Sequence, residues 1–149
     1  MKLTLSVSYG VGVLLQIEDL ARDGPVTAAR IARGCRFPPR FLYRVLRKLV
    51  DAGLLRGTSG PGGGYALAKS PDEISLLEIV LGVESGLAPS VLEPACSAQR
   101  PAISYVNELC VRNAKLFADE LSQVTLADLE RMDEAGRRPP RTRPKVKAR

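Results

Sequence analysis

The amino-acid sequence predicts a mainly α-helical fold that contains one small β-hairpin. Two stretches, residues 3–22 and 102–123, repeat apolar residues at the spacing of a helix. Between them, residues 54–56 and 65–67 are short apolar segments that flank a turn rich in glycine and proline. Such a turn between two strand-like segments is typical of an antiparallel hairpin.

Three helices are expected before the hairpin. The first covers residues 3–22, and Thr27 is suited to cap a short second helix. Pro39 suits the first turn of a third helix, and Gly53 favours the left-handed backbone that follows a helix end. The expected apolar stripe of the first helix is Leu5, Tyr9, Val13, Ile17 and Leu20. Three short helices with a tight turn before the third resemble a helix-turn-helix.

The glycine-rich stretch RGTSGPGGGYAL, residues 56–67, has three interpretations: a phosphate-binding loop of a nucleotide enzyme, a flexible linker, or the tip of a hairpin. A phosphate-binding loop needs strand–loop–helix order and a Gly-Lys-Ser/Thr ending. Here Gly63 and Gly64 stand at that ending, and a strand follows. A linker is disfavoured because apolar strand residues bracket the loop closely. The third helix and this hairpin therefore predict a winged helix-turn-helix.

Three further helices are expected after the hairpin. Ser75 and Glu78 form a capping box at the start of the fourth helix. The long helix over residues 102–123 follows, and Thr125 with Asp128 can cap a last short helix.

The long helix carries a seam of apolar residues beyond what the winged helix needs for its core. The seam alternates steps of three and four residues, which is the spacing of paired helices. We therefore expect a homodimer, with one more core helix of a monomer as the alternative. The seam residues are Ile103, Val106, Cys110, Ala114, Phe117, Leu121 and Val124. The expected organisation is a winged helix-turn-helix over residues 1–85, a connection over 86–101, a dimerisation region over 102–135 and a basic, disordered tail over 136–149.

Positive charge is concentrated in two segments of a chain whose net charge is +6. Residues 30–69 hold nine basic residues against the single acidic Asp51, and residues 136–149 hold seven basic residues and no acidic one. Charge concentrated in this way favours contact with a polyanion, although a solvated charged face is the alternative. Double-stranded DNA is the partner that a winged helix with such charge predicts.

Several other function classes are disfavoured. Histidine is absent, which removes the commonest general base and the commonest zinc ligand, so we expect neither an enzyme nor a metal site of the usual kind. No apolar run approaches the roughly eighteen residues of a membrane span, and no signal-peptide pattern is present. We expect a cytoplasmic protein.

Four motifs together resemble the IscR/NsrR/CymR type of bacterial winged-helix transcription regulator. They are MKLT at the N-terminus, FLYRVLRKLVDAGLL in the third helix, GPGGGYALAK in the wing, and SQVTLADL after the long helix. The resemblance covers about residues 1–133. It implies a homodimeric repressor that crosses or swaps its long helices and binds an inverted-repeat operator through the third helix and the wing.

Arginine on the third helix suits the reading of DNA bases. One guanidinium can grip guanine with two hydrogen bonds, which contribute about 1–3 kcal/mol of discrimination. Glycines in the wing allow its backbone to approach DNA closely because no Cβ intervenes. Relatives often carry an arginine where Ser59 stands here, which leaves Arg56 as the nearest cation before the glycines. The candidate DNA-binding residues are Thr27, Arg36, Arg40, Tyr43, Arg44, Arg47, Arg56, Ser59, Gly60, Gly62, Gly63 and Lys69.

The resemblance also raises the question of an iron–sulfur cluster, which many relatives hold through three cysteines near the start of the long helix. Here the connection offers only Cys96, Ser104 stands at the usual third position, and Cys110 falls on the apolar seam. Cys35 lies far along the chain, in the helix-turn-helix. We expect no cofactor, with a cluster held by unusual ligands such as Glu93 as the alternative.

Two further possibilities stay open on sequence. The signal could be oxidation of Cys96, a regulatory partner protein or a small ligand. A function of another class would be a winged-helix protein-interaction module with an RNA-binding tail. The arginines of the third helix disfavour that function, because protein-binding faces are richer in exposed apolar and aromatic residues.

Overall fold

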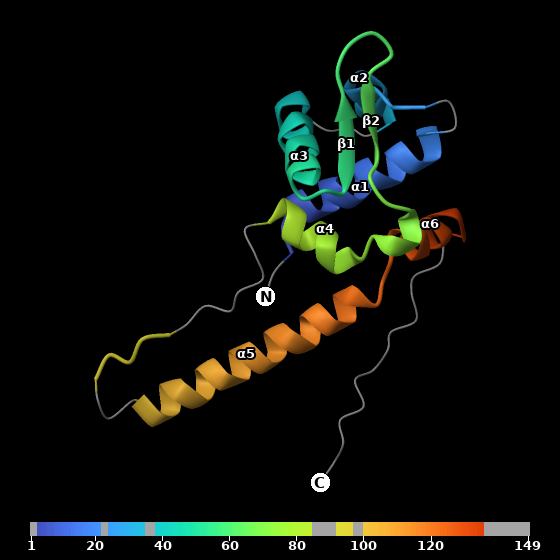
Figure 1. The fold of residues 1–149 in the computed structure, drawn as a ribbon. Helices are drawn as coiled ribbons and strands as arrows, with labels where there is room; N and C mark the ends of the chain where they lie inside the picture. Colours follow the sequence, from blue (N-terminus) through green and yellow to red (C-terminus); the bar gives the residue numbers. More distant parts are fainter. Residues whose placement is uncertain (1–2, 22–23, 35–37, 85–91, 97–99, 136–149) are drawn as a thin grey trace.

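The computed structural model describes residues 3–21, 24–34, 38–84, 92–96 and 100–135, and shows a helical body with a hairpin at one end and a long helix at the other (Figure 1). The elements are α1 (Leu5–Leu20), α2 (Ala28–Gly34), α3 (Pro39–Asp51), β1 (Leu55–Thr58), β2 (Gly64–Leu67), the short 3-10 helix η2 (Pro71–Glu73), α4 (Leu76–Val83), α5 (Arg100–Ser122) and α6 (Leu126–Ala135). This confirms the expected fold class. The expected connection lies largely outside the described residues, as does the whole tail.

The helix ends follow the local signals in the sequence. The Thr27 hydroxyl accepts a hydrogen bond of 3.3 Å from the Arg30 amide at the start of α2. Ser75 and Glu78 form the expected capping box of α4, and the Thr125 hydroxyl caps α6 by accepting from the Asp128 amide at 3.2 Å. Gly53 has φ +71° after α3, a conformation that costs glycine little because it has no Cβ. These capping predictions are confirmed.

The buried face of α1 follows the expected stripe except at Leu5. Val13 and Ile17 are fully buried, and Tyr9 and Leu20 pack against the core. Leu5 is 70% exposed, and the residues buried along α1 are Val7, Gly10, Val13, Leu14 and Ile17. Gly10 explains part of the difference, because a Cβ there would lie 2.9 Å from a methyl of Val83 on α4. The missing side chain lets α1 approach α4 closely, so Gly10 is part of the buried face.

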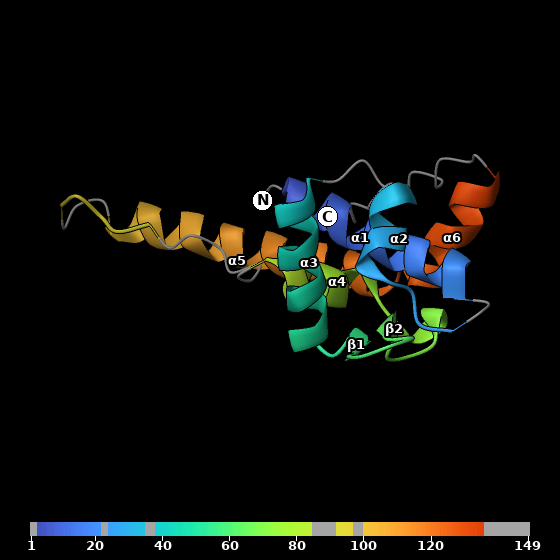
Figure 2. The same ribbon diagram turned by 90° about the horizontal axis from the view of Figure 1, so that it is seen from above.

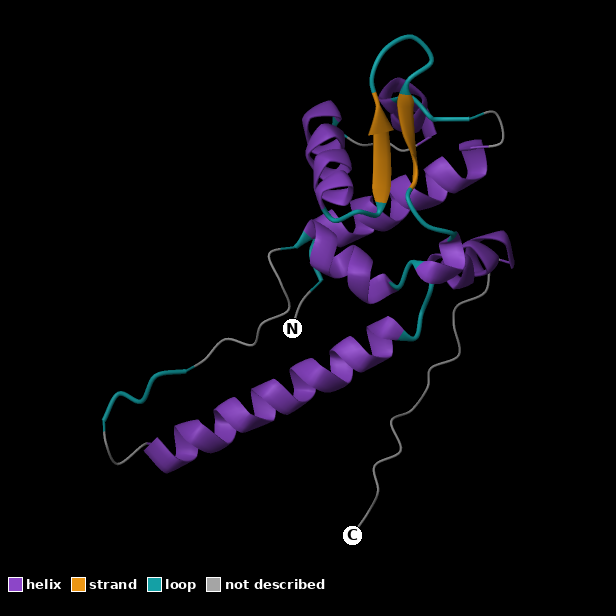
Figure 3. Ribbon diagram, in the orientation of Figure 1, coloured by secondary structure: helices purple, strands orange, loops and turns teal. Residues whose placement is uncertain are grey.

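The wing, residues 55–67, is a two-stranded antiparallel hairpin with Leu55 paired to Leu67 and Thr58 paired to Gly64 (Figure 3). Val26, just before α2, exchanges two backbone hydrogen bonds of 2.8 Å with Tyr65. A Cβ at Gly64 would lie 2.7 Å from the Val26 backbone. The hairpin is therefore attached to the helix-turn-helix at its β2 edge.

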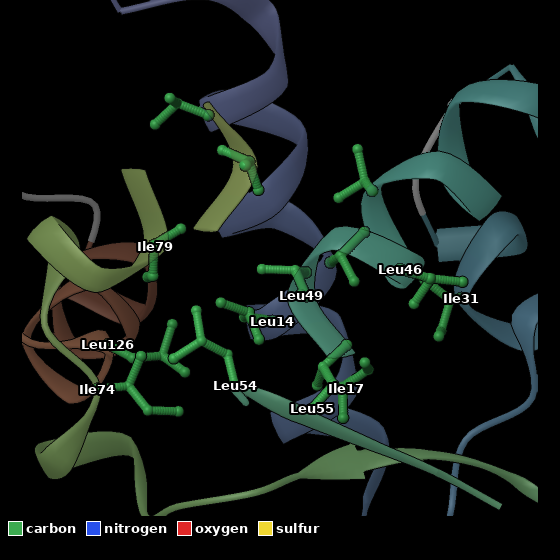
Figure 4. Packing of buried hydrophobic residues seen from close by; sticks show 14 of the residues in the cluster. Leu14, Ile17, Ile31, Leu46, Leu49, Leu54, Leu55, Ile74, Ile79 and Leu126 are labelled. Carbon is green, nitrogen blue, oxygen red and sulfur yellow. The ribbon is translucent and has the colours of Figure 1, made fainter. Parts of the chain in front are cut away.

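The core lies where α1, α3, α4 and the start of the hairpin meet (Figure 4). Leu14 and Ile17 of α1 pack with Leu46 and Leu49 of α3 in this cluster, and all four are fully buried. Leu126 of α6 joins the same cluster. Among the described residues, no polar or charged side chain is buried. The core thus fixes α3 against the body by its apolar side and leaves its polar side outward.

Helix α5 contacts α4 and then extends beyond the body (Figure 2). Leu121 is only 7% exposed, and Phe117 packs against the core of the same chain. The C-terminal part of the expected dimer seam therefore serves the chain's own core. By contrast, Tyr105 and Leu116 lie outside the expected seam, and their side chains are exposed. Their exposed fractions are 59% and 58%.

Candidate nucleic-acid interface

Four polar residues line the outward side of α3. Arg40, Tyr43, Arg44 and Arg47 are all exposed, whereas Leu42, Val45, Leu46 and Leu49 are buried. The exposed four follow the spacing i, i+3, i+4 and i+7, which places them on one face of a helix. We call Arg40, Tyr43, Arg44 and Arg47 the arginine face. Three cations and one aromatic ring on an exposed helix are suited to a nucleic-acid groove.

Two contacts order the side chains of the arginine face. The guanidinium carbon of Arg44 lies 5.4 Å from the centroid of the Phe41 ring, which is a cation–π geometry. Arg47 lies 3.8 Å from the Asp51 carboxylate, and both side chains are largely exposed. An exposed pair of this kind contributes little and can exchange for a phosphate contact.

The wing lies beside α3, so both can reach one surface (Figures 1 and 2). A shallow groove of about 310 Å³ separates them, and its lining residues are Arg47, Val50, Gly57, Thr58, Ser59, Gly64 and Tyr65. Ser59, Gly60 and Gly62 are exposed at the wing tip, and the two glycines have φ of +98° and +77°. Gly63 is half-buried, and a Cβ there would lie 2.3 Å from the Thr58 carbonyl oxygen.

Other candidate residues have local roles in the free protein. Lys69 donates to the Glu78 carboxylate at 2.6 Å, at the base of the wing. Thr27 caps α2, as described above. Arg56 is exposed, and its guanidinium donates to the Leu67 carbonyl across the hairpin at 3.5 Å. Arg36 lies outside the described residues. The structure thus brings Arg47 of α3 and Ser59 of the wing to one groove, whereas Lys69 and Thr27 make local hydrogen bonds.

Two residues near the interface were not singled out from sequence. Lys48, on the back of α3, donates to the Val83 carbonyl at the end of α4 at 2.5 Å, so it joins two helices and does not face outward with the arginines. Phe41 supports Arg44. The pair is separated by three residues on one helix, and that spacing is the only local signal that could have found it.

The pKa shifts in the described part of the chain belong to carboxylates at helix starts and junctions. Hydrogen bonds from Lys69 and from the Ser75 backbone lower the pKa of Glu78. The Thr4 hydrogen bonds lower the pKa of Glu84, where α4 ends beside α1. Backbone and hydroxyl hydrogen bonds from Thr125 lower the pKa of Asp128. These carboxylates stabilise the scaffold that carries α3.

The described cysteines do not assemble a set of cluster ligands. Cys96 is exposed in the connection, and Cys110 is half-buried on α5. Within the described residues, no three His, Cys, Asp or Glu side chains come close enough together to hold a metal ion. Cys35 lies outside them. Helices long and apolar enough to cross a membrane are likewise absent from the part of the chain that the structure describes.

Comparisons with known proteins agree with the winged fold. The chain matches the Rrf2 family, described as iron-dependent transcriptional regulators, over residues 3–131. It is 32% identical over 134 residues to protein Rrf2 of Nitratidesulfovibrio vulgaris, which covers 88% of each chain. It is 28% identical over 130 residues to the HTH-type transcriptional regulator CymR of Bacillus subtilis, covering 87% of this chain and 89% of CymR.

The fold comparison leads to the same family. The solved structure of CymR, described as the global cysteine regulator of Bacillus subtilis, superposes with a TM-score of 0.68 at 27% identity. That match covers 88% of this chain and 97% of CymR. These relatives are transcription regulators and not enzymes. The chain belongs to the Rrf2 family of winged-helix, DNA-binding transcription regulators.

Proposed function

We propose that the protein is a repressor that acts in the bacterial cytoplasm and reads an inverted-repeat operator through α3. The observation that carries this proposal is the arginine face, which is exposed along one side of α3 and lies beside the wing. An exposed helix with this composition fits the major groove, where arginine can bind guanine with two hydrogen bonds. The wing tip, Ser59 to Gly62, would contact the adjacent sugar–phosphate backbone.

Among the cations, Arg40 and Arg44 are the proposed base readers because they lie in the N-terminal half of α3, the part that enters the groove in helix-turn-helix proteins. Arg47 lines the groove beside the wing and is the proposed phosphate contact. Arg56 is a second phosphate contact from the hairpin. Lys69 would have to leave Glu78 to reach DNA, so we assign it no part in reading bases.

The proposal is tested by mobility shifts with DNA from upstream of the protein's own gene and with random DNA of equal length. We expect a specific complex with wild-type protein that Arg44→Ala weakens by about one to two powers of ten, the equivalent of one good arginine–guanine pair. Lys115→Ala is the matched control, because Lys115 is an exposed cation of α5, outside α3 and the wing. Equal losses in the two variants, or no preference in the wild type, would contradict the proposal.

We further propose that the active form is a homodimer built on α5. Tyr105, Leu109 and Leu116 are spaced so that they share one side of this helix. Tyr105 and Leu116 are more than half exposed, and Leu109 is partly exposed. We call these three residues the free face of α5. A row of exposed large apolar residues on a helix that extends from the body favours a partner surface, and a second copy of the chain is the occupant we propose.

The free face modifies the expected seam. Phe117 and Leu121 pack into the chain's own core, and Val124 lies beyond the end of α5. The seam residues of α5 left for the partner are therefore Ile103, Val106, Cys110 and Ala114. We propose that the free face and this N-terminal part of the seam together form the dimer contact, with two α3 helices then available for two half-sites.

We also propose that the protein works without the three-cysteine iron–sulfur site of its relatives. Support comes from Ser104, which is exposed and stands at the usual third ligand position, and from the separate settings of Cys96 and Cys110. The connection near Cys96 is tied to α5 by two hydrogen bonds between the Asn107 side chain and the Leu92 backbone, of 2.9 and 3.0 Å. Oxidation of the exposed Cys96 thiol is the signal we favour, because its segment, residues 92–96, is hydrogen-bonded to α5 at Leu92.

A further inference from the structure

One aromatic ring joins the scaffold to the arginine face. The Phe41 ring lies between α1 and the outward side of α3 and is half-buried. Its centroid lies 5.4 Å from that of Tyr9 on α1, with the two ring planes inclined by 72°. The same ring lies 5.4 Å from the guanidinium carbon of Arg44. A single side chain therefore contacts both an α1 residue of the scaffold and a proposed base reader.

Both contacts have a defined geometry. Inclined aromatic rings at this separation adopt an edge-to-face arrangement, in which the positive edge of one ring meets the negative face of the other. A guanidinium near an aromatic ring is attracted by the ring's quadrupole and can lie flat against it. Phe41 is itself restrained by Tyr9, so it offers Arg44 a fixed support. An apolar side chain without a ring would fill space but would offer no such attraction.

Support of this kind matters most for a side chain that must bind in one orientation. A free arginine loses rotamer freedom when it docks against a base edge, and that loss opposes binding. An arginine already held near its docking direction loses less. The benefit is specific to a base contact with fixed donor directions, because a phosphate can be met by a cation from many directions.

We propose that Phe41 is a positioning residue for DNA reading, which holds Arg44 in its base-reading orientation and is itself held by Tyr9. This inference rests on the proposed function of α3 as the DNA reader. Phe41 does not contact DNA in this account; it acts through Arg44. Its role differs from that of Leu42, Val45 and Leu46, which are buried and stabilise the helix itself.

The surroundings of Phe41 allow the ring to be changed without remaking the core. An open apolar groove of about 900 Å³, lined by residues 3–8 and Phe41, adjoins the ring. Phe41→Tyr keeps the ring, and an added hydroxyl has solvent-accessible space nearby. Phe41→Leu keeps an apolar side chain and removes the ring. The two variants therefore separate the loss of the ring from the loss of apolar contact.

The test begins with selection of a preferred DNA sequence by the wild-type protein from a random library. Affinity for this sequence and for random DNA is then measured for four proteins: wild type, Phe41→Leu, Phe41→Tyr and Tyr9→Leu. We expect Phe41→Leu to lower the ratio of the two affinities about two- to fivefold, the size of an exposed cation–π contact, with little change on random DNA. Phe41→Tyr should retain the ratio, and Tyr9→Leu should lower it less than Phe41→Leu. Thermal unfolding of each variant identifies any that fails to fold.

A double-variant cycle separates positioning from a structural role. In an Arg44→Ala background, Phe41→Leu should change the affinity ratio no further, because the residue through which it acts is gone. The same fold-change in both backgrounds, or an unchanged ratio in folded Phe41→Leu and Tyr9→Leu, would overturn the inference. If Arg44→Ala itself left the ratio intact, Phe41 would have nothing to position. If the wild-type protein enriched no sequence, the proposed function would fail instead, so the two failures are distinguishable.

Discussion

At the scale of single residues, side chains in this protein divide between those that build the scaffold and those that remain available for DNA. Lys48 and Arg44 show the division within one helix. The Lys48 ammonium donates to the carbonyl at the end of α4, whereas the Arg44 guanidinium stays exposed beside an aromatic ring. Both residues contribute to the basic charge of residues 30–69, and charge counting alone assigns them the same role.

Because the Glu78 carboxylate caps α4, we expect the free energy of unfolding to depend on pH in the acid range. Its pKa is lowered in the folded protein by hydrogen bonds from Lys69 and Ser75. A lowered folded pKa contributes stability that is present above the unfolded value of 4.5 and is lost as pH falls through the folded value. We therefore expect Glu78→Gln to be less stable than wild type near neutral pH. Between about pH 5 and pH 3, the melting temperature of Glu78→Gln should fall by less than that of wild type.

The control for this prediction is Glu108→Gln, which changes an exposed glutamate on α5. Its melting temperature should follow the wild-type curve through the same pH range. Melting curves of Glu78→Gln that ran parallel to wild type would show that the capping box contributes no acid sensitivity.

The cysteines give a second prediction at the residue scale. Protein purified without oxygen should lack the visible absorption of an iron–sulfur centre, because Ser104 replaces a thiolate and serine is a poor ligand for such clusters. Iron and acid-labile sulfide are measured on the same sample. Stoichiometric amounts of both, lost together in Cys96→Ala, would revive the cluster with unusual ligands.

At the scale of elements, the local parts of the fold could be predicted from the sequence. The capping boxes, the proline start of α3 and the glycine after it involve residues within four positions of each other, so the sequence displays them directly. The wing was predictable for the same reason, although its strands begin at Leu55 and Gly64 and extend further into the turn than expected.

The contacts between elements could not be predicted in this way. Val26 pairs with Tyr65, and Lys69 pairs with Glu78, through approaches that depend on how helices and hairpin pack. On α1, the exposure of Leu5 and the burial of Gly10 have a similar cause, since α1 packs closely on α4 at Gly10. On α5, Phe117 and Leu121 pack into the chain's own core. Apolar spacing alone cannot distinguish such core residues from the residues of a dimer seam.

This difference on α5 predicts opposite outcomes for two neighbouring substitutions. Leu116→Glu places a carboxylate on the free face and should dissociate the dimer while the monomer stays folded. Phe117→Glu places the same charge against the core and should lower stability by several kcal/mol, as unpaired buried charges do. Light scattering gives the oligomeric state, and circular dichroism gives the folding of each variant.

The pair is its own control, because both variants add one glutamate to the same helix at adjacent positions. A dimer that survived Leu116→Glu at micromolar concentration would remove the free face from the contact. Loss of fold in both variants would show that the free face is packed in solution within one chain.

At the scale of the whole molecule, we expect different parts of the chain to supply attraction to DNA and recognition of its sequence. The tail, residues 136–149, carries seven basic residues and lies outside the residues that the structure describes. Basic residues of this kind release counterions at any phosphate, so they raise affinity for all DNA and steepen its salt dependence. The arginine face, by contrast, presents donors fixed on a helix that the core holds in place, and fixed donors can select bases.

Two half-sites follow from the proposed dimer. A symmetric dimer presents two α3 helices, and helix-turn-helix dimers reach half-sites separated by about one helical turn, roughly 34 Å, or a multiple of it. The operator should therefore be an inverted repeat, which footprinting of the protected DNA would reveal. Protection of a single, asymmetric site would contradict a symmetric arrangement.

The most direct test of the central claim, that α3 reads the DNA sequence, is the ratio of affinities for operator and random DNA in two altered proteins. One lacks residues 137–149, and the other carries Arg40→Ala, Tyr43→Ala and Arg44→Ala together. The account predicts that removing the tail weakens both affinities by similar factors, flattens the salt dependence by up to about seven phosphate contacts and keeps the ratio. The triple variant should bring the ratio close to one while remaining folded. A ratio abolished by the tail deletion and kept by the triple variant would show that α3 is not the reader.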